Sequence, residues 1–176
     1  MRVKPVDTLN LSSILKIKSY MKFYISIIIT LTILILDLAT KHWVESNLVL
    51  GQHIPYTSFF NLVLAHNAGA AFSFLSDSSG WQRWFLSGIA ITASAVITYL
   101  LYKHSTEKLF CFALSLILGG ALGNLWDRIT LGYVVDFLDF YVADYHWPAF
   151  NIADSAIFIG AGLLIIESFQ QKNKGE

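Results

Sequence analysis

Apolar residues gather in four long segments of the chain, and polar or charged residues separate these segments from one another. A helix that crosses a bilayer needs about 20 predominantly apolar residues, and each segment approaches that length. The second and third segments hold no charged residue, whereas the first holds Asp37 past its start and the fourth holds Asp154 and Glu167 near its ends. The pattern predicts four transmembrane helices, at about Met21–Thr40, Trp84–Tyr102, Leu109–Trp126 and Asn151–Phe169.

The first segment also resembles a cleaved signal peptide, because basic residues precede its apolar core. No small-x-small cleavage site follows it, and the chain continues with DLATKHW, so we expect a retained helix. The stretch before Met21 is polar. We therefore divide the chain into a polar N-terminal extension over residues 1–20, a single four-helix domain over residues 21–169 and a tail over residues 170–176.

Basic residues lie mainly on one side of the predicted helices. They precede the first helix, separate the second from the third and follow the fourth, as Arg2, Lys4, Lys16, Lys18, Lys22, Lys103, Lys108, Lys172 and Lys174. The only basic residues of the two long connections are Lys41, Arg83 and Arg128. Because short cytoplasmic flanks are enriched in Lys and Arg, both termini are predicted to be cytoplasmic and both long connections to face outward.

Composition supports a membrane protein. The chain of 176 residues is 55% hydrophobic and 14% charged, with a mean hydropathy of +0.57. Soluble domains carry about a quarter charged residues. The formal net charge of zero argues against a nucleic-acid surface. The single cysteine, Cys111, lies in an apolar run and excludes an intrachain disulfide.

Three predicted helices place an aspartate at a similar height. With a rise of about 1.5 Å per residue, Asp37, Asp127 and Asp154 lie about 22, 27 and 27 Å from the inner ends of their helices. Asp136 lies in the connection between the third and fourth helices. Any one of these carboxylates could simply mark the point where a helix end meets water, and Asp154 could cap the start of its helix. Four of them at one level, near the outer surface, favour a functional site.

The third predicted helix carries a stripe of small residues. Gly119, Gly123 and Asp127 repeat every four residues, and Gly120 and Asn124 line the adjacent stripe. Small residues at this spacing let helices approach closely, which by itself indicates packing. Because the same face also carries Asn124 and Asp127, a close helix contact would place polar side chains inside the protein rather than in lipid.

The region Thr57–Phe74 is rich in aromatic and β-branched residues and is interrupted at Asn67–Gly69. This composition predicts short strands around a turn, on or near the outer surface. Its backbone groups could pair with an extended peptide. Alternatively, the region is an interfacial hairpin anchored by Phe59, Phe60 and Phe72. The sequence leaves both interpretations open.

Asp136 in VVDF (Val134–Phe137) and Asp154 in PAFNIAD (Pro148–Asp154) are 18 residues apart across a predicted loop. Two carboxylates held a few ångströms apart do not both ionise easily, and partial burial raises their pKa values. Such a pair shares one proton, so that one group acts as base towards water and the other as acid towards a carbonyl oxygen. We expect the pair to titrate as a unit.

Five motifs, in order along the whole chain, resemble those of the lipoprotein signal peptidase (signal peptidase II) family. They are LDLATK (Leu36–Lys41), NAGAAFSF (Asn67–Phe74), GGALGNLWDR (Gly119–Arg128), VVDF (Val134–Phe137) and PAFNIADSAI (Pro148–Ile157). The resemblance implies an all-α membrane protein of the bacterial inner membrane, with four transmembrane helices, a small periplasmic β-cradle and an interfacial loop. It further implies cleavage of lipid-modified prolipoproteins just before the diacylglyceryl-cysteine, and inhibition by globomycin. We expect a monomer in contact with bilayer lipids.

The resemblance also implies roles for individual residues. Asp136 and Asp154 would be the catalytic dyad of an aspartic endopeptidase, activating water at the periplasmic face without a covalent intermediate, a metal or a cofactor. Asp37 and Lys41 would be structural polar residues, and Asp127 would pair with or orient Arg128. Substrate binding or support of the site would fall to Asn67, Asn124, Asp127, Arg128 and Asn151.

One position departs from the family pattern, because many members carry Gln where this chain has Leu38. We therefore do not expect the polar contact that Gln would make at this position, but the proposed catalytic residues are unaffected.

Other reaction classes fit the sequence less well. A zinc protease would need a helical HExxH pair, and the five histidines are scattered. Ser73 and Ser155 have no evident His or Lys partner for serine catalysis, and the GxGD motif of presenilin-type proteases is absent. A proton or ion pathway would spread ionisable residues through the membrane's depth, whereas here they cluster at one level.

Overall fold

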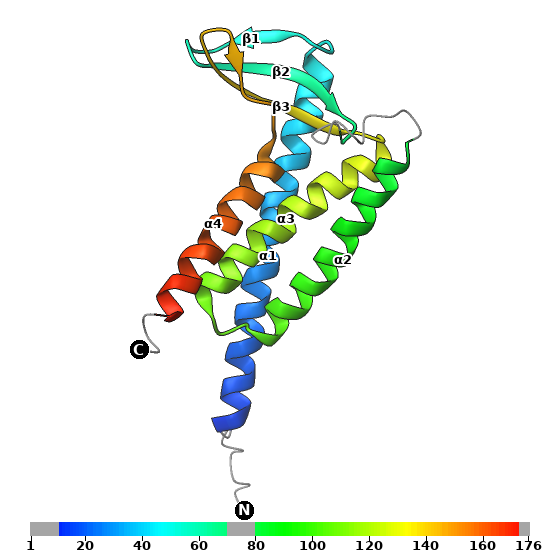
Figure 1. Ribbon diagram of the computed structural model, residues 1–176. Coiled ribbons are helices and arrows are strands. Elements are labelled where there is room, and N and C mark those ends of the chain that lie inside the picture. Colours follow the sequence, from blue (N-terminus) through cyan, green and yellow to red (C-terminus); the bar gives the residue numbers. More distant parts are fainter. Residues whose placement is uncertain (1–10, 70–79, 173–176) are drawn as a thin grey trace, which may run out of the picture.

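The computed structural model describes residues 11–69 and 80–172, which form a bundle of four helices with a small sheet at one end (Figure 1). The helices are α1 (Leu11–Asn47), α2 (Trp81–Lys103), α3 (Lys108–Thr130) and α4 (Ile152–Lys172). All four are long and apolar enough to cross a membrane, which confirms the four predicted spans. The first helix begins at Leu11 rather than at Met21, so the helix includes half of the segment that we predicted as an extension.

Helix α3 is the centre of the bundle and packs against α1, α2 and α4. Its small residues allow this close packing, as the sequence predicted. A methyl group on Gly120 would overlap the backbone carbonyl of Ala153 in α4, and one on Gly123 would overlap the carboxylate of Asp37 in α1. The glycines therefore bring α1 and α4 against the face of α3 that carries Asn124 and Asp127.

Four antiparallel strands form the sheet, in the order β1-β2-β3-β4. Their bounds are His53–Pro55 for β1, Phe60–Asn67 for β2, Val134–Val142 for β3 and Tyr145–His146 for β4. The central pair, β2 and β3, comes from the two long connections, and the sheet lies at the end of the bundle away from the start of α1 (Figure 1).

One prediction for this region needs correction. Asp136 lies within strand β3, where its Cα faces Ala65 of β2, and not in a loop. Within the described residues, the strand partners of β2 are β1 and β3. Pairing between segments about 70 residues apart leaves no trace in the local pattern. The part of the predicted hairpin beyond Gly69, including Phe72, lies outside the described residues.

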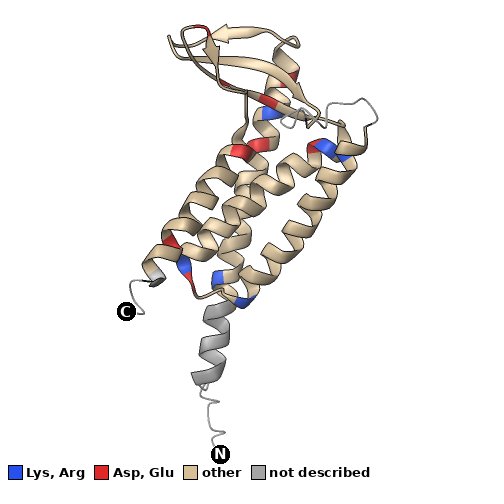
Figure 2. Ribbon diagram, viewed as in Figure 1, with Lys and Arg blue, Asp and Glu red and all other residues tan. Residues whose placement is uncertain are grey.

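An apolar cluster fixes the sheet to the bundle. Val44 and Leu48, in and just after α1, pack with Leu64 of β2 and with Val135 and Phe137 of β3, and all five are buried. Burying one such side chain contributes about 1.5–3 kcal/mol, so the cluster holds β3 rigidly over the helices. Charged residues gather toward the two ends of the bundle, and several acidic residues lie near the junction with the sheet (Figure 2).

Candidate active site

Asp136 and Asp154 lie at the junction of sheet and bundle. Asp136 is on β3 and Asp154 is in the first turn of α4. Strand β3 runs beside the segment that enters α4, because the carbonyl of Phe150 accepts hydrogen bonds from Phe137 N (3.0 Å) and Leu138 N (2.8 Å). This pairing brings Asp136 next to the start of α4.

Asn151 links the two aspartates. Its side-chain oxygen accepts a hydrogen bond from the backbone N–H of Asp154 at 2.9 Å and so caps α4. Its amide nitrogen donates to Asp136 Oδ1 at 2.7 Å, with Val135 O and Asn124 Oδ1 at 3.2 and 3.3 Å. The side chain is fully buried, so a single orientation serves the helix cap and the carboxylate together.

Two more asparagines hold the carboxylates from other elements. Asn67, at the end of β2, donates from Nδ2 to Asp136 Oδ2 at 2.9 Å. Asn124, on α3, donates from Nδ2 to Asp154 Oδ1 at 2.7 Å. Each aspartate therefore has an amide donor on one of its oxygens at least, and the network Asn67–Asp136–Asn151–Asn124–Asp154 is continuous.

The two carboxylates differ in their surroundings. Asp136 is 2% exposed, whereas Asp154 is partly buried and borders an open pocket. Burial, helped by the negative charge of Asp154, raises the pKa of Asp136 to about 7, against the opposing hydrogen bonds from Asn67 and Asn151 and the charge of Lys41. Two acids within electrostatic range, one of them protonated near neutral pH, can exchange a proton with water and substrate.

A buried lysine lies directly behind the site. Lys41 Nζ contacts Asp37 Oδ2 at 2.7 Å and Asp127 Oδ2 at 2.9 Å, and donates to Asn124 Oδ1 at 2.9 Å. Asp37 in turn accepts the backbone N–H of Ala153 at 2.8 Å. Lys41 therefore orients Asn124, the residue that holds Asp154, and the cluster ties α1, α3 and α4 together.

Asp127 was expected to pair with or orient Arg128, and its negative charge lies within electrostatic range of the guanidinium. Asp127 pairs with Lys41 and accepts the backbone N–H of Val135 at 3.2 Å, and within the described residues no ion pair joins it to Arg128. Consecutive helical residues point about 100° apart, because a turn holds about 3.6 residues. The two side chains therefore face different neighbours.

Arg128 faces the aspartates instead. Its side chain is partly buried, donates from Nη1 to the carbonyl of Asn124 at 3.3 Å, and lies within electrostatic range of Asp154 and Asp136. A guanidinium in this position has further N–H groups for a bound acceptor such as a peptide carbonyl.

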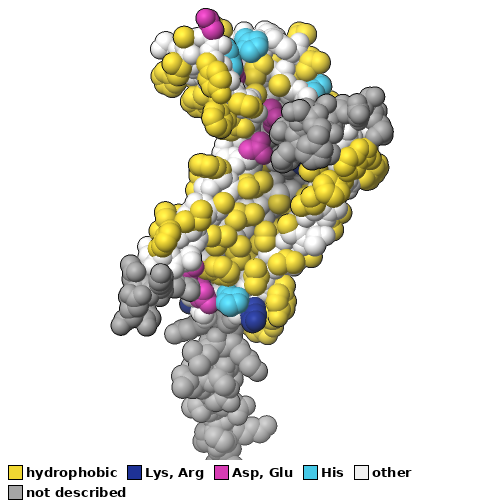
Figure 3. Space-filling model, in the orientation of Figure 1, with side chains coloured by type: hydrophobic (Ala, Val, Ile, Leu, Met, Phe, Trp, Pro, Cys, Tyr) yellow, Lys and Arg dark blue, Asp and Glu magenta, His cyan; other side chains and the backbone are white. Residues whose placement is uncertain are grey.

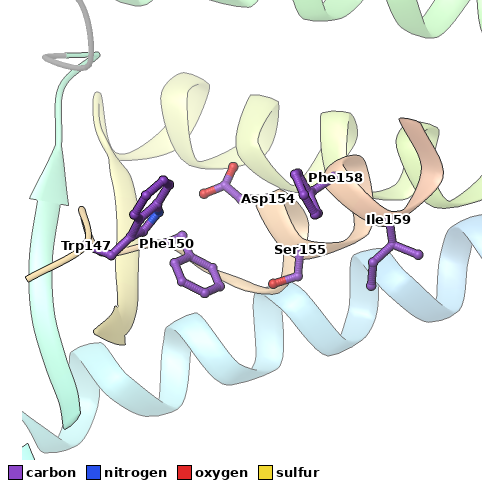
Figure 4. Close-up of a pocket in the computed structure, with 6 residues that line it drawn as sticks. All are labelled: Trp147, Phe150, Asp154, Ser155, Phe158 and Ile159. Carbon is purple, nitrogen blue, oxygen red and sulfur yellow. The ribbon is translucent and has the colours of Figure 1, made fainter. Parts of the chain in front are cut away.

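A pocket of about 540 Å³ opens beside Asp154 (Figure 4). Figure 4 shows Trp147 and Phe150 on one side of Asp154 and Phe158 and Ile159 on the other. The remaining lining residue, Ser155, donates from Oγ to the carbonyl of Asn151 at 2.9 Å and so is engaged within its own helix. In the space-filling view, acidic atoms reach the surface between the sheet and the bundle (Figure 3).

The nine polar residues to which the family resemblance gave roles thus meet at one junction: Asp37, Lys41, Asn67, Asn124, Asp127, Arg128, Asp136, Asn151 and Asp154. The aromatic walls of the pocket were missed. A signal for them exists, because Phe150 and Phe158 stand four residues before and after Asp154. Across residues 11–69 and 80–172, no group of three His, Cys, Asp or Glu side chains is arranged to hold a metal ion.

Comparison with known proteins identifies close relatives. The family model described as "Signal peptidase (SPase) II" matches residues 29–170. The chain is 54% identical over 144 residues to the lipoprotein signal peptidase of Cupriavidus pinatubonensis, covering 82% of each chain. It is 49% identical over 155 residues to that of Serratia proteamaculans, covering 84% of this chain and 92% of the relative. A solved bacterial membrane enzyme at 33% identity superposes with a TM-score of 0.76, covering 86% of this chain and 91% of that one.

Proposed function

The chain belongs to the signal peptidase II family, a family of membrane proteases, and we propose that it is an aspartic endopeptidase that cuts prolipoproteins just before the diacylglyceryl-modified cysteine. The observation that supports the proposal is the asparagine network that connects Asp136 with Asp154 at the junction of sheet and bundle. One carboxylate is buried and the other borders an apolar pocket. A pair of carboxyl groups that can act as acid and base therefore lies beside a pocket that can hold a lipid-bearing substrate.

The proposed reaction is a direct attack by water. The ionised carboxylate takes a proton from water, whose oxygen bonds to the scissile carbonyl carbon, while the protonated carboxylate gives its proton to the carbonyl oxygen. The C–N bond then breaks as the first carboxylate passes its proton to the departing nitrogen and the second recovers its own. Atoms balance with one water consumed, without a covalent intermediate, and neither a metal nor a cofactor is required.

Complementation tests the proposed activity in a cell. A bacterium depleted of its own lipoprotein signal peptidase accumulates uncut, lipid-modified precursor. We expect this chain to restore the mature lipoprotein, and globomycin to block that restoration. Accumulation of precursor despite normal membrane levels of the chain would contradict the proposal.

Arg128 is proposed to bind a carbonyl of the substrate peptide. Lys keeps the charge but lacks the planar fork of donors. Since a hydrogen bond to a charged group contributes about 1.5–3 kcal/mol, Arg128→Lys is expected to lower kcat/KM about tenfold to a hundredfold. Steady-state cleavage of a lipidated peptide measures the change, with the thermal midpoint as a check on folding. An unaltered kcat/KM would show that Arg128 does not bind the substrate and is only a charged residue near the end of α3.

The pH dependence follows from the raised pKa of Asp136, about 7. The active pair holds one proton, and that proton is lost as the pH rises through this value. The kcat/KM of the wild-type chain is therefore expected to fall above about pH 7, approaching about tenfold per pH unit. Rates measured from pH 5 to 9 at constant ionic strength check this. A profile that stays flat to pH 9 would show that the shared proton is not needed.

The pocket beside Asp154 is proposed to seat an acyl chain of the substrate. Its walls are mainly apolar, and it adjoins the exposed side chains of Phe158 and Ile159 on the membrane-spanning helix α4. A chain seated there would continue into the surrounding lipid, while the cysteine's peptide bond lies at Asp154. This arrangement explains why the enzyme acts within a membrane.

Narrowing the pocket tests this placement. Ile159→Trp is expected to raise KM about tenfold for long-chain diacylglyceryl substrates, because about two methylene groups lose their burial. Substrates with short acyl chains should be affected much less. Ile165→Trp, on the exposed face of the same helix and outside the pocket, is the matched control. Equal KM values for both variants would exclude the pocket as the acyl site.

We also propose how the chain is placed in the membrane. We place the chain in the bacterial inner membrane as a monomer, with both termini cytoplasmic and the sheet and Asp136 at the periplasmic face. The bundle supports this, because α1 begins and α4 ends at the end away from the sheet (Figure 1). Residues 21–169 would be the peptidase domain, between the extension and the tail.

A further inference from the structure

A second cavity lies at the opposite end of the bundle from the aspartates. It measures about 550 Å³ and is lined by residues 21–29 of α1, the turn between α2 and α3, and the first residues of α3. Most of its surface is apolar side chain. The proposed peptidase reaction makes no use of this groove.

Two lysines of separate helices line the groove. Lys22 comes from α1, and Lys108 is the first residue of α3. None of the lining residues is acidic. The neighbouring acid on this turn, Glu107, is held by His104, whose Nδ1 lies 2.8 Å from Glu107 Oε1. The lining itself therefore carries two cations and no carboxylate.

Apolar side chains follow the lysines one turn deeper on both helices. On α1, Ile25 and Ile29 come one and two turns after Lys22, and on α3 Phe112 comes one turn after Lys108. The two lysines are complementary to an anionic phosphate headgroup, and the apolar part of the groove below them is complementary to an acyl chain. Basic pockets between transmembrane helices bind anionic lipid headgroups in this way.

We propose that this groove binds one anionic phospholipid, with its phosphate between Lys22 and Lys108 and an acyl chain along Ile25, Ile29 and Phe112. The lipid would fill the gap between α1 and α3 at the end away from the sheet and stabilise their packing. The proposal depends only on the charges and shape of the groove, and stands whether or not the chain cleaves prolipoproteins.

Native mass spectrometry of the purified chain in detergent tests the proposal. Phosphatidylglycerol is expected to remain bound as a single adduct and to raise the thermal midpoint, and phosphatidylcholine with the same acyl chains to do neither. The double variant Lys22→Gln/Lys108→Gln should weaken phosphatidylglycerol binding at least tenfold. Lys103→Gln is the matched control, since Lys103 is exposed at the end of α2 and does not line the groove.

Filling the groove without changing its charge separates a lipid from a free phosphate. Ile29→Trp should abolish the adduct while both lysines remain, and sn-glycerol 3-phosphate, which has no acyl chain, should not bind. Equal losses in Lys103→Gln and in the double variant would show diffuse attraction and overturn the proposal. Retention of the lipid by Ile29→Trp, or equal retention of phosphatidylcholine, would overturn it as well.

Discussion

Asp136→Asn is expected to lower the rate of prolipoprotein cleavage about a thousandfold, the typical contribution of a positioned acid or base. The amide has the shape of the carboxylate but neither gives up nor accepts the shared proton. Asp154→Asn is expected to do the same, because in the proposed mechanism each group completes the other's proton transfer. Single-turnover cleavage of a lipidated precursor by purified variants measures both effects.

The variants should remain folded, so that the loss reports chemistry. Asparagine has the volume of aspartate, but its one carbonyl oxygen can accept from only one of Asn67 and Asn151, so the thermal midpoint in detergent should fall only slightly. Asp144→Asn is the matched control, since Asp144 is an exposed aspartate between β3 and β4 of the same sheet. Its rate should equal that of the wild-type chain. More than a tenth of normal turnover in either dyad variant would remove that residue from the proposed mechanism.

Lys41→Met is expected to cause the largest loss of stability. The substitution removes the cation that lies 2.7 Å from Asp37 and 2.9 Å from Asp127, all three side chains being almost fully buried. Breaking a buried ion pair by removing one partner costs about 3–5 kcal/mol, because a charge is left without compensation. Unfolding by a denaturing detergent in mixed micelles measures the change in the free energy of unfolding.

Two further variants define the origin of the effect. Lys103→Met removes an exposed lysine and should leave the free energy of unfolding unchanged. Lys41→Met combined with Asp127→Asn should recover part of the loss, since one unpaired carboxylate is then neutral. The single variant should also lose activity, because Lys41 orients Asn124 and Asn124 holds Asp154. A change below about 1 kcal/mol for Lys41→Met, the range of exposed pairs, would show that the cluster does not stabilise the bundle.

The helices were predictable because their signal is local. A run of about 20 apolar residues predicts a span without reference to the rest of the chain, and the four spans are confirmed. The glycine stripe likewise predicted the close contact of α3 with its neighbours. The same arithmetic placed Asp37 and Asp127 at similar heights, and the structure joins them through Lys41.

The sheet and the details of the site were not predictable in the same way. Strand β3 exists because Val135 and Phe137 pack on α1 and because β2, far away in sequence, pairs with it. The ion-pair partner of Asp127 is Lys41, because this face of α3 meets α1, and that contact was not evident from sequence proximity. Asn151 illustrates the limit well, since a helix was predicted to begin there, but neither its capping bond to Asp154 nor its hydrogen bond to Asp136 was predicted.

One measurement tests the central claim most directly, namely that this junction of sheet and bundle cleaves prolipoproteins. The purified wild-type chain is incubated in detergent with a precursor peptide that carries a diacylglyceryl-cysteine, with and without globomycin. The masses of the products are then measured by mass spectrometry. We predict two fragments whose masses place the cut immediately before the lipidated cysteine, and none when globomycin is present. An intact peptide, or a cut at another bond, would contradict the account.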